Sequence, residues 1–418
     1  MSNVVHASPW GARSRSSGAR GWLAGFLFAW ALGAATASAQ DAPTAQAGGS
    51  IQPGPIYDLL IGTYTHGTSR GIYVYRFDSA TGQVSPVSSV QTVNPSYLVV
   101  TPDARYVYAV NELPGDTGPA SERGGISAFA FDPRAGQLTF LDRVSSEGND
   151  PCYLAFSPDG RYLLTANYSV AADPGGSFAV FPLQEDGHVG AAVLVVHHEG
   201  GGPVKGRQDN AHVHSTVFTP DGHYLFTQDL GNDKLYEYRY TNDGSRGLLS
   251  PVPEGYVQMP AGSGPRHLVF APNGRDAYLT SELAGTVTTL RYADGKLAPL
   301  QVLPLAARGF AGKIGAGAIH LSPDGKFLYA TNRGDANEIV IFAVDAHDGS
   351  LKLVGRQSTL GRTPREFAID PTGRWLIVGN QDSDSAYVFR RDPVTGLLAD
   401  PTRLSIGSPV DFKFTPSS

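Results

Sequence analysis

The sequence predicts an all-β fold, a seven-bladed β-propeller, from a turn that recurs along the chain. Six Pro-Asp-Gly-like turns each lie between two short apolar runs, at intervals of 48 to 62 residues. The turns begin at Pro102, Pro158, Pro220, Pro272, Pro323 and Pro371. A repeat of about 50 residues with several short strands is typical of a propeller, in which each repeat forms one blade.

The seventh repeat is divided between the two ends of the chain. Residues 409–416 match the first half of a repeat, and residues 57–65 match the missing second half. A ring of blades would otherwise expose a strand edge where the chain begins and ends. We therefore expect one blade to be completed by strands from both termini.

Composition and patterning favour strands throughout a single propeller domain at residues 56–418. The chain of 418 residues contains 50 Gly and 30 Pro, which suits many tight turns better than long helices. Its hydrophobic runs are short or alternate with polar residues, as expected for strands.

The first 39 residues have the pattern of a secretory signal peptide. Three arginines precede an uncharged apolar run at 21–36, which ends in small residues at 37–39. The alternative is a membrane anchor, but this run is short for a span. We expect an exported protein, periplasmic or secreted, with a flexible linker at 40–55 and no membrane association after cleavage.

Charge and cysteine content exclude some partners and constraints. The chain has 32 Lys and Arg against 38 Asp and Glu, and the leader removes three Arg and no acid, which leaves a net charge of −9. An acidic protein without a basic run is a poor nucleic-acid binder. The single cysteine, Cys152, excludes an internal disulfide. The sequence does not indicate the oligomeric state.

The repeat also predicts which residues gather at one mouth of the central channel. The strands on either side of each turn form an antiparallel hairpin, so residues equally far from the turn lie side by side. Positions six before and ten after each Pro should meet at the open end. The first set is Ser96, Cys152, His214, Arg266, Gly317, Arg365 and Val410. The second set is Tyr64, Glu112, Tyr168, Leu230, Glu282, Arg333 and Gln381.

Arg266 and Glu282 form the strongest candidate pair, because they flank a single hairpin. They could be a structural ion pair that closes the hairpin. They could instead be an arginine that binds an anion beside a carboxylate that moves a proton. Arg333 and Arg365 would add positive charge suited to a carboxylate or phosphate. As an alternative, these two arginines could pair with nearby acids, namely Glu366, Asp335 or Asp382.

His212 and His214 are two residues apart and should share one face of a strand. Such a pair can form half of a metal site, but no Cys, His or Asp group with ligand spacing accompanies it, so we expect no metal. The remaining interpretations are a general acid or base and a neutral histidine bonded in the channel wall. Cys152 has no adjacent His or Lys that would activate it as a nucleophile.

Four segments carry these candidates together with their turns. They read AHVHSTVFTPDGHYLFTQDLGNDKLYEY, GPRHLVFAPNGRDAYLTSE, HLSPDGKFLYATNRG and TPREFAIDPTGRWLIVGNQDSD. Over residues 56–416 the chain resembles the seven-bladed propeller lactonase family, which includes bacterial 6-phosphogluconolactonases and fungal 3-carboxy-cis,cis-muconate lactonizing enzymes. The resemblance implies that the catalytic residues are His214, Arg266, Glu282 and Arg333.

The function that this resemblance implies is hydrolysis of a small anionic or sugar lactone without a cofactor. Water would attack the ring carbonyl with Glu282 or His214 as general base, while Arg266 and Arg333 hold the substrate anion and the developing oxyanion. Further residues expected to bind the substrate are His212, Arg365, Gln381 and Glu112. The alternatives are a muconate-type cycloisomerase that closes a lactone and a non-catalytic propeller that binds a protein or glycan.

Overall fold

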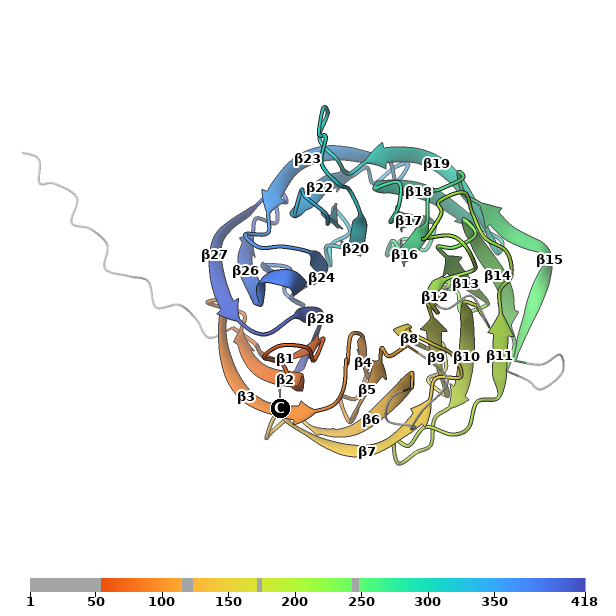
Figure 1. Ribbon diagram of the computed structural model, residues 1–418. Helices are drawn as coiled ribbons and strands as arrows, with labels where there is room; N and C mark the ends of the chain where they lie inside the picture. Colours follow the sequence, from red (N-terminus) through yellow and green to blue (C-terminus); the bar gives the residue numbers. More distant parts are fainter. Residues whose placement is uncertain (1–53, 115–122, 171–174, 243–247, 418) are drawn as a thin grey trace, which may run out of the picture. The chain divides into compact units, whose positions relative to one another are not determined.

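The computed structural model describes residues 54–114, 123–170, 175–242 and 248–417. Within these ranges, 28 strands form seven four-stranded antiparallel sheets, arranged as blades around a central axis (Figure 1). The predicted all-β, seven-bladed propeller is therefore confirmed. The expected signal peptide at 1–39 and nearly all of the linker at 40–55 lie outside the described residues. No helix in the described part of the chain is long and apolar enough to cross a membrane.

Six of the described blades are each built from four consecutive strands, the first strand being innermost. Blade 1 contains β4 (Leu98–Val100), β5 (Tyr106–Asn111), β6 (Gly125–Asp132) and β7 (Gln137–Ser145). Blade 2 contains β8 (Pro151–Phe156), β9 (Tyr162–Asn167), β10 (Ser177–Pro182) and β11 (Leu194–His197). Blade 3 contains β12 (Val213–Phe218), β13 (Tyr224–Asp229), β14 (Lys234–Tyr240) and β15 (Leu249–Gln258).

The next three blades follow the same plan around the ring. Blade 4 contains β16 (Pro265–Phe270), β17 (Asp276–Ser281), β18 (Thr286–Ala293) and β19 (Lys296–Pro304). Blade 5 contains β20 (Ala316–Leu321), β21 (Phe327–Asn332), β22 (Glu338–Val344) and β23 (Leu351–Ser358). Blade 6 contains β24 (Pro364–Ile369), β25 (Trp375–Asn380), β26 (Ser385–Arg391) and β27 (Leu398–Ser405).

Blade 7 closes the ring with strands from both ends of the domain. Its order is β28 (Pro409–Pro416), β1 (Ile56–Thr63), β2 (Gly71–Asp78) and β3 (Gln83–Gln91). The C-terminal β28 pairs with β1 along its whole length, and Figure 1 shows the two lying side by side. The predicted closure by both termini is thus confirmed, and it removes the strand edge that an open ring would expose.

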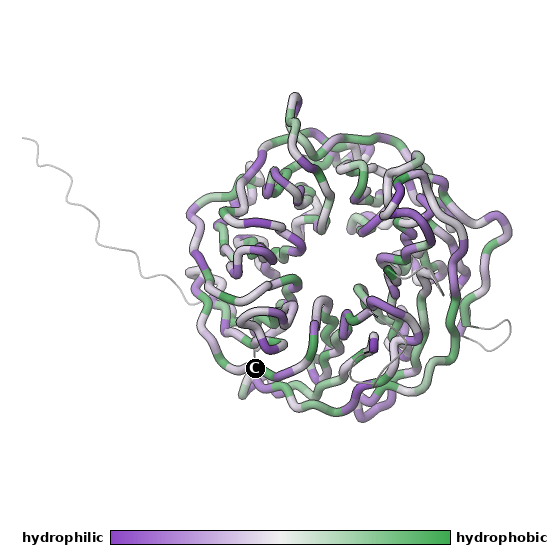
Figure 2. The backbone as a smooth tube through the Cα atoms, viewed as in Figure 1, coloured by the Kyte–Doolittle hydropathy of each residue, from purple (hydrophilic) through white to green (hydrophobic). Residues whose placement is uncertain are grey.

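The hydrophobic core is divided among the contacts between neighbouring blades. Seven clusters of buried side chains occur in the described residues, and each joins two adjacent blades. Between blades 7 and 1, for example, Leu60 and Val74 pack with Val107 and Phe129. Figure 2 shows hydrophobic stretches in every part of the ring. Each blade therefore buries apolar surface on both faces, and the ring is stabilised by closure as well as by packing.

The recurrent turn has the geometry that its sequence predicts. In five copies the glycine of the turn has a positive φ, between 65° and 72°, which glycine adopts without steric cost. The first copy has Ala104 instead, with φ 56°. These turns fix where each inner hairpin begins and hence where its open end lies.

A β-bulge near the open end distinguishes the inner strands from simple hairpins. Six of the seven innermost strands in the described chain place an unpaired residue there. The residues in the bulges are Cys152, His214, Arg266, Gly317 with Ala318, Arg365 and Val410. A bulge re-aims a side chain and increases the local twist. All residues of the first predicted set except Ser96 therefore sit in bulges, rather than in plain cross-strand pairs as expected.

Candidate active site

One mouth of the channel contains a cavity of about 320 Å³, named the mouth pocket below. Its lining residues are Glu112, Asp150, Cys152, Tyr168, Val170, Arg207, His214, Glu282, Arg333 and Arg365. Seven of these ten described residues occupy the positions predicted from the repeat. The volume lies in the range of small-molecule sites.

Glu282 gathers three arginines at one side of the mouth pocket. Its Oε1 lies 2.5 Å from Arg207 Nη2, and its Oε2 lies 3.1 Å from Arg266 Nε and 2.6 Å from Arg333 Nη2. Glu282 is only 8% exposed and Arg266 only 1%. Both carboxylate oxygens are thus occupied by guanidinium groups, and the predicted pairing of Arg266 with Glu282 is observed within a larger cluster.

The charges in this cluster stay ionised at neutral pH. Burial opposes ionisation of Glu282, but the positive charges of Arg333 and Arg266 outweigh it and hold the pKa of Glu282 well below its ordinary value. Burial, together with the neighbouring Arg333, lowers the pKa of Arg266 to about 10. A carboxylate whose two oxygens both bind guanidinium groups is poorly placed to accept a proton from water. Glu282 therefore serves to hold the arginines together.

Glu112 organises the opposite side of the mouth pocket. Tyr64 donates a hydrogen bond of 2.8 Å to its Oε1, and Ser96 donates one to its Oε2. Arg365 Nη2 lies 3.3 Å from the same Oε2, and the Arg365 guanidinium lies over the Tyr64 ring at 5.3 Å. Glu112 thus orients one arginine, Arg365, whereas Glu282 orients three.

His214 projects from its bulge in β12 into the pocket between these two groups. It is 4% exposed, and its Nδ1 lies 3.9 Å from Cys152 Sγ. Burial, with a further contribution from Arg266, lowers the pKa of His214 well below its ordinary value. The imidazole is therefore neutral at neutral pH and keeps a lone pair that can accept a proton. Burial raises the pKa of the Cys152 thiol, so this cysteine is not an activated nucleophile.

Two predicted substrate-binding residues lie outside the described lining of the mouth pocket. His212 precedes β12 and stacks on Tyr168, with ring centroids 4.4 Å apart, so it supports a pocket residue from behind. His214 lies in the bulge of β12, and its ring also contacts Tyr168, with centroids 5.7 Å apart, so both histidines pack on the same tyrosine. Gln381 begins the short 3-10 helix η2 (Gln381–Ser383). Its N–H donates to Thr363 O at 3.1 Å, as Glu282 N donates to Gly264 O, so Gln381 keeps its place at the open end of the hairpin without lining the mouth pocket.

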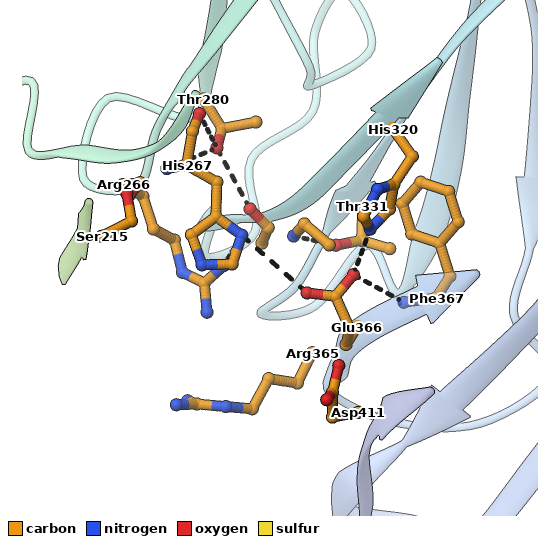
Figure 3. Close-up of polar contacts among 12 residues, drawn as sticks. Ser215, Arg266, His267, Thr280, His320, Thr331, Arg365, Glu366, Phe367 and Asp411 are labelled. Carbon is orange, nitrogen blue, oxygen red and sulfur yellow. Dashed lines mark hydrogen bonds and ion pairs between the residues drawn. The ribbon is translucent and has the colours of Figure 1, made fainter. Parts of the chain in front are cut away.

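Glu366 lies next to the mouth pocket in the channel wall and pairs with histidines. Its Oε1 lies 2.7 Å from His320 Nε2 and its Oε2 lies 3.8 Å from His267 Nδ1. Figure 3 shows the carboxylate between these two rings. The expected alternative, in which Glu366 pairs with Arg333 or Arg365, is not observed. Those two arginines bind Glu282 and Glu112 instead.

Comparison with known proteins assigns the chain and its fold to one family. The family model described as Lactonase, 7-bladed beta-propeller matches residues 58–414. The chain belongs to this family. Among its relatives, the 6-phosphogluconolactonase of Formosa agariphila is 36% identical over 343 residues, which is 81% of this chain and 94% of the relative. The 6-phosphogluconolactonase of Bacillus subtilis is 35% identical over 362 residues, or 86% of this chain and 98% of the relative.

Solved structures of this lactonase family superimpose well on the chain. The periplasmic gluconolactonase of Pseudomonas aeruginosa is 46% identical, with a TM-score of 0.83, and the match covers 87% of this chain and 100% of that structure. A putative 6-phosphogluconolactonase from Bacteroides fragilis is 40% identical, with a TM-score of 0.79, and covers 86% of this chain.

Three lining residues of this lactonase-family pocket do not follow from the repeat count. Arg207 lies in the loop between β11 and β12, and the adjacent Gln208 anchors that loop by donating to Leu230 O at 2.8 Å. Asp150 and Val170 flank the hairpin of blade 2 just beyond the counted positions. The only sequence signal for Arg207 is its place shortly before the His-x-His segment.

Proposed function

We propose that this chain hydrolyses a neutral, unphosphorylated aldonolactone, such as glucono-δ-lactone, to its aldonic acid. It shares the fold and family of proteins named 6-phosphogluconolactonase and gluconolactonase. Its mouth pocket combines a neutral imidazole with several guanidinium groups, a combination suited to acyl transfer to water.

The observation that favours a neutral substrate is the charge balance of the mouth pocket. Its described lining has three arginines and three carboxylates, so the formal charges cancel. Each of these arginines already lies against a carboxylate. A phosphate dianion, or a muconate with several carboxylates, would compete with these internal anions. A neutral lactone would not, and it would bring only the single negative charge that develops during the reaction.

His214 is the general base in this mechanism. Its neutral imidazole removes a proton from water as the water attacks the ring carbonyl. Glu282 is less suited to this role, because both its oxygens already bind arginines. The protonated imidazole then returns the proton to the ring oxygen as the carbonyl–oxygen bond breaks.

Arg333 and Arg365 stabilise the oxyanion from opposite sides of the pocket. Both line it, and Arg365 uses only Nη2 for hydrogen bonding to the described residues, which leaves further donors available. Arg266 does not line the pocket and acts by holding Glu282 in place. Fixed guanidinium groups favour the transition state because its carbonyl oxygen carries more negative charge than that of the substrate.

We further propose that residues 1–39 direct export and that the reaction takes place outside the cytoplasm. The relative from Pseudomonas aeruginosa is named periplasmic, and it matches the chain over the propeller. Phosphorylated sugar lactones are products of cytoplasmic metabolism, so an exported enzyme would meet unphosphorylated ones. This location and the charge balance of the pocket point to the same substrate class.

The test compares substrates with the purified protein. We expect hydrolysis of glucono-δ-lactone well above its spontaneous rate, with kcat/KM at least about tenfold higher than for the 6-phosphate ester. A reversed preference would contradict the neutral substrate. Ring closure of 3-carboxy-cis,cis-muconate at a higher kcat/KM would favour the cycloisomerase. Failure to turn over any lactone would favour the non-catalytic propeller.

A further inference from the structure

Asp150 is a buried acid in the wall of the mouth pocket that the proposed mechanism does not use. It directly precedes β8 and is 9% exposed. Its Oδ2 accepts a hydrogen bond of 2.9 Å from the Val170 backbone N–H. Its Oδ1 accepts no hydrogen bond from any described residue. A carboxylate can accept about four hydrogen bonds. The Asp150 side chain, which lines the pocket, can therefore accept further hydrogen bonds from a ligand.

The backbone holds this carboxylate firmly in position. Asp150 N donates to Leu113 O at 2.9 Å, and Asp150 O accepts from Tyr168 N at 3.0 Å. Its φ of 50° lies in the left-handed region, which Asp and Asn tolerate better than most residues but which still costs free energy. Because the backbone is fixed, the Asp150 carboxylate is held in one orientation relative to a ligand in the pocket.

No cation neutralises Asp150 within the described part of the chain. It forms no ion pair there, because the arginines of the pocket bind Glu282 and Glu112. Burial raises the pKa of Asp150, and the charge of Glu112 adds to this effect. A desolvated acceptor of this kind is best satisfied by neutral hydrogen-bond donors. No group of three or more metal-ligating side chains occurs among the described residues, so hydroxyl groups of a ligand are the fitting donors.

We propose that Asp150 binds ring hydroxyl groups of the lactone and so makes the enzyme selective for polyhydroxylated lactones. The proposal rests on lactone hydrolysis as the function of this site. Aldonolactones carry hydroxyls on adjacent ring carbons, and a carboxylate can accept from two of them at once. A site built to bond a hydroxyl discriminates strongly against the analogue that lacks it.

The experiment compares two six-membered lactones that differ in their hydroxyls, glucono-δ-lactone and δ-valerolactone. Asp150→Asn removes the charge, and Asp150→Gly removes the whole side chain. Both Asn and Gly adopt a positive φ at little cost, so neither variant should disturb the backbone. In both variants the ratio of kcat/KM for glucono-δ-lactone to that for δ-valerolactone should fall about tenfold, mainly through KM. Asp186→Asn, at an exposed turn outside the pocket, is the matched control and should leave the ratio unchanged.

A second readout separates this inference from the function itself. Gluconolactam carries the same hydroxyls, but its amide bond resists hydrolysis, so it reports binding alone. Its binding should weaken by a similar factor in both Asp150 variants. An unchanged substrate ratio, or equal losses on both lactones, would overturn the role of Asp150. If the wild type hydrolyses neither lactone, the proposed function fails. The hydroxyl-binding role then survives only if gluconolactam binds and the Asp150 variants weaken that binding.

Discussion

The two ends of the inner hairpins differ in how closely they obey the repeat. At the turn end the same hydrogen bond recurs. In four blades a Ser or Thr hydroxyl donates to the Asp two residues later, at 2.6 Å. At the mouth end the residue in the bulge varies from blade to blade. One blade places Cys152 in its bulge, another His214, another Arg266 and another Arg365.

This difference separates the residues that build the ring from those that act on a ligand. Uniform residues at the turn end make equivalent hairpins, and stacking of equivalent hairpins produces the ring. The mouth ends of six hairpins then contribute varied side chains to a shared pocket. The chemistry consequently resides where the repeats diverge, and changes at the two ends should have different effects.

Removing the charge of Glu282 should have the largest effect. Glu282→Gln leaves Arg207, Arg266 and Arg333 close together without their common counter-charge. We expect kcat/KM for glucono-δ-lactone to fall by about 10²-fold or more, measured above the spontaneous rate. Glu338→Gln is the matched control, because Glu338 also pairs with an arginine, at 2.5 Å, but lies outside the mouth pocket. Comparable losses in both variants would contradict a special role for Glu282.

Removing the charge of Glu112 should have a smaller effect at the same mouth. Glu112→Gln affects one arginine, Arg365, and the amide oxygen can still accept from Tyr64. We expect a loss in kcat/KM of about tenfold, chiefly through KM. Steady-state kinetics on the purified variant measure this split. A loss as large as that of Glu282→Gln would mean that the two carboxylates are equivalent.

A change at the turn end should affect stability and leave catalysis intact. Asp221 accepts hydrogen bonds from Thr219 Oγ1 at 2.6 Å, from His223 N at 2.9 Å and from Tyr292 OH at 2.7 Å. Asp221→Ala should lower the free energy of unfolding by about 1–3 kcal/mol, seen as a lower urea midpoint. Its kcat/KM should equal that of the wild type. Lost activity in a variant of unchanged stability would show that the two ends are coupled.

Much of this architecture could be predicted because a repeat constrains every blade in the same way. The spacing of the turns predicted the number of blades, and the half-repeats at residues 57–65 and 409–416 predicted the closing blade. Counting from Pro220, Pro272 and Pro323 also selected residues that line or contact the mouth pocket. These predictions depend on local geometry that is shared by all copies.

The remaining features are those in which a blade departs from the shared geometry. The bulges could not be predicted, because a count of residues does not distinguish a paired strand residue from an unpaired one. Gln381 keeps the backbone position at the open end that the count predicts, but it does not line the mouth pocket, and a count of residues cannot show which side chains reach the cavity. Arg207 lies in the loop between β11 and β12, outside the counted hairpin, so no strand register could place it against Glu282.

The kcat/KM of His214→Asn for glucono-δ-lactone, measured across pH beside that of the wild type, tests the assignment of His214 as general base most directly. A histidine with a depressed pKa stays neutral as the pH falls through its ordinary value, and a glutamate with a depressed pKa stays ionised. After correction for spontaneous hydrolysis, the wild-type activity should therefore remain level from about pH 7.5 to about pH 6. It should be lost at every pH in His214→Asn. A wild-type decline centred near pH 6.5, or an active His214→Asn enzyme, would contradict this mechanism.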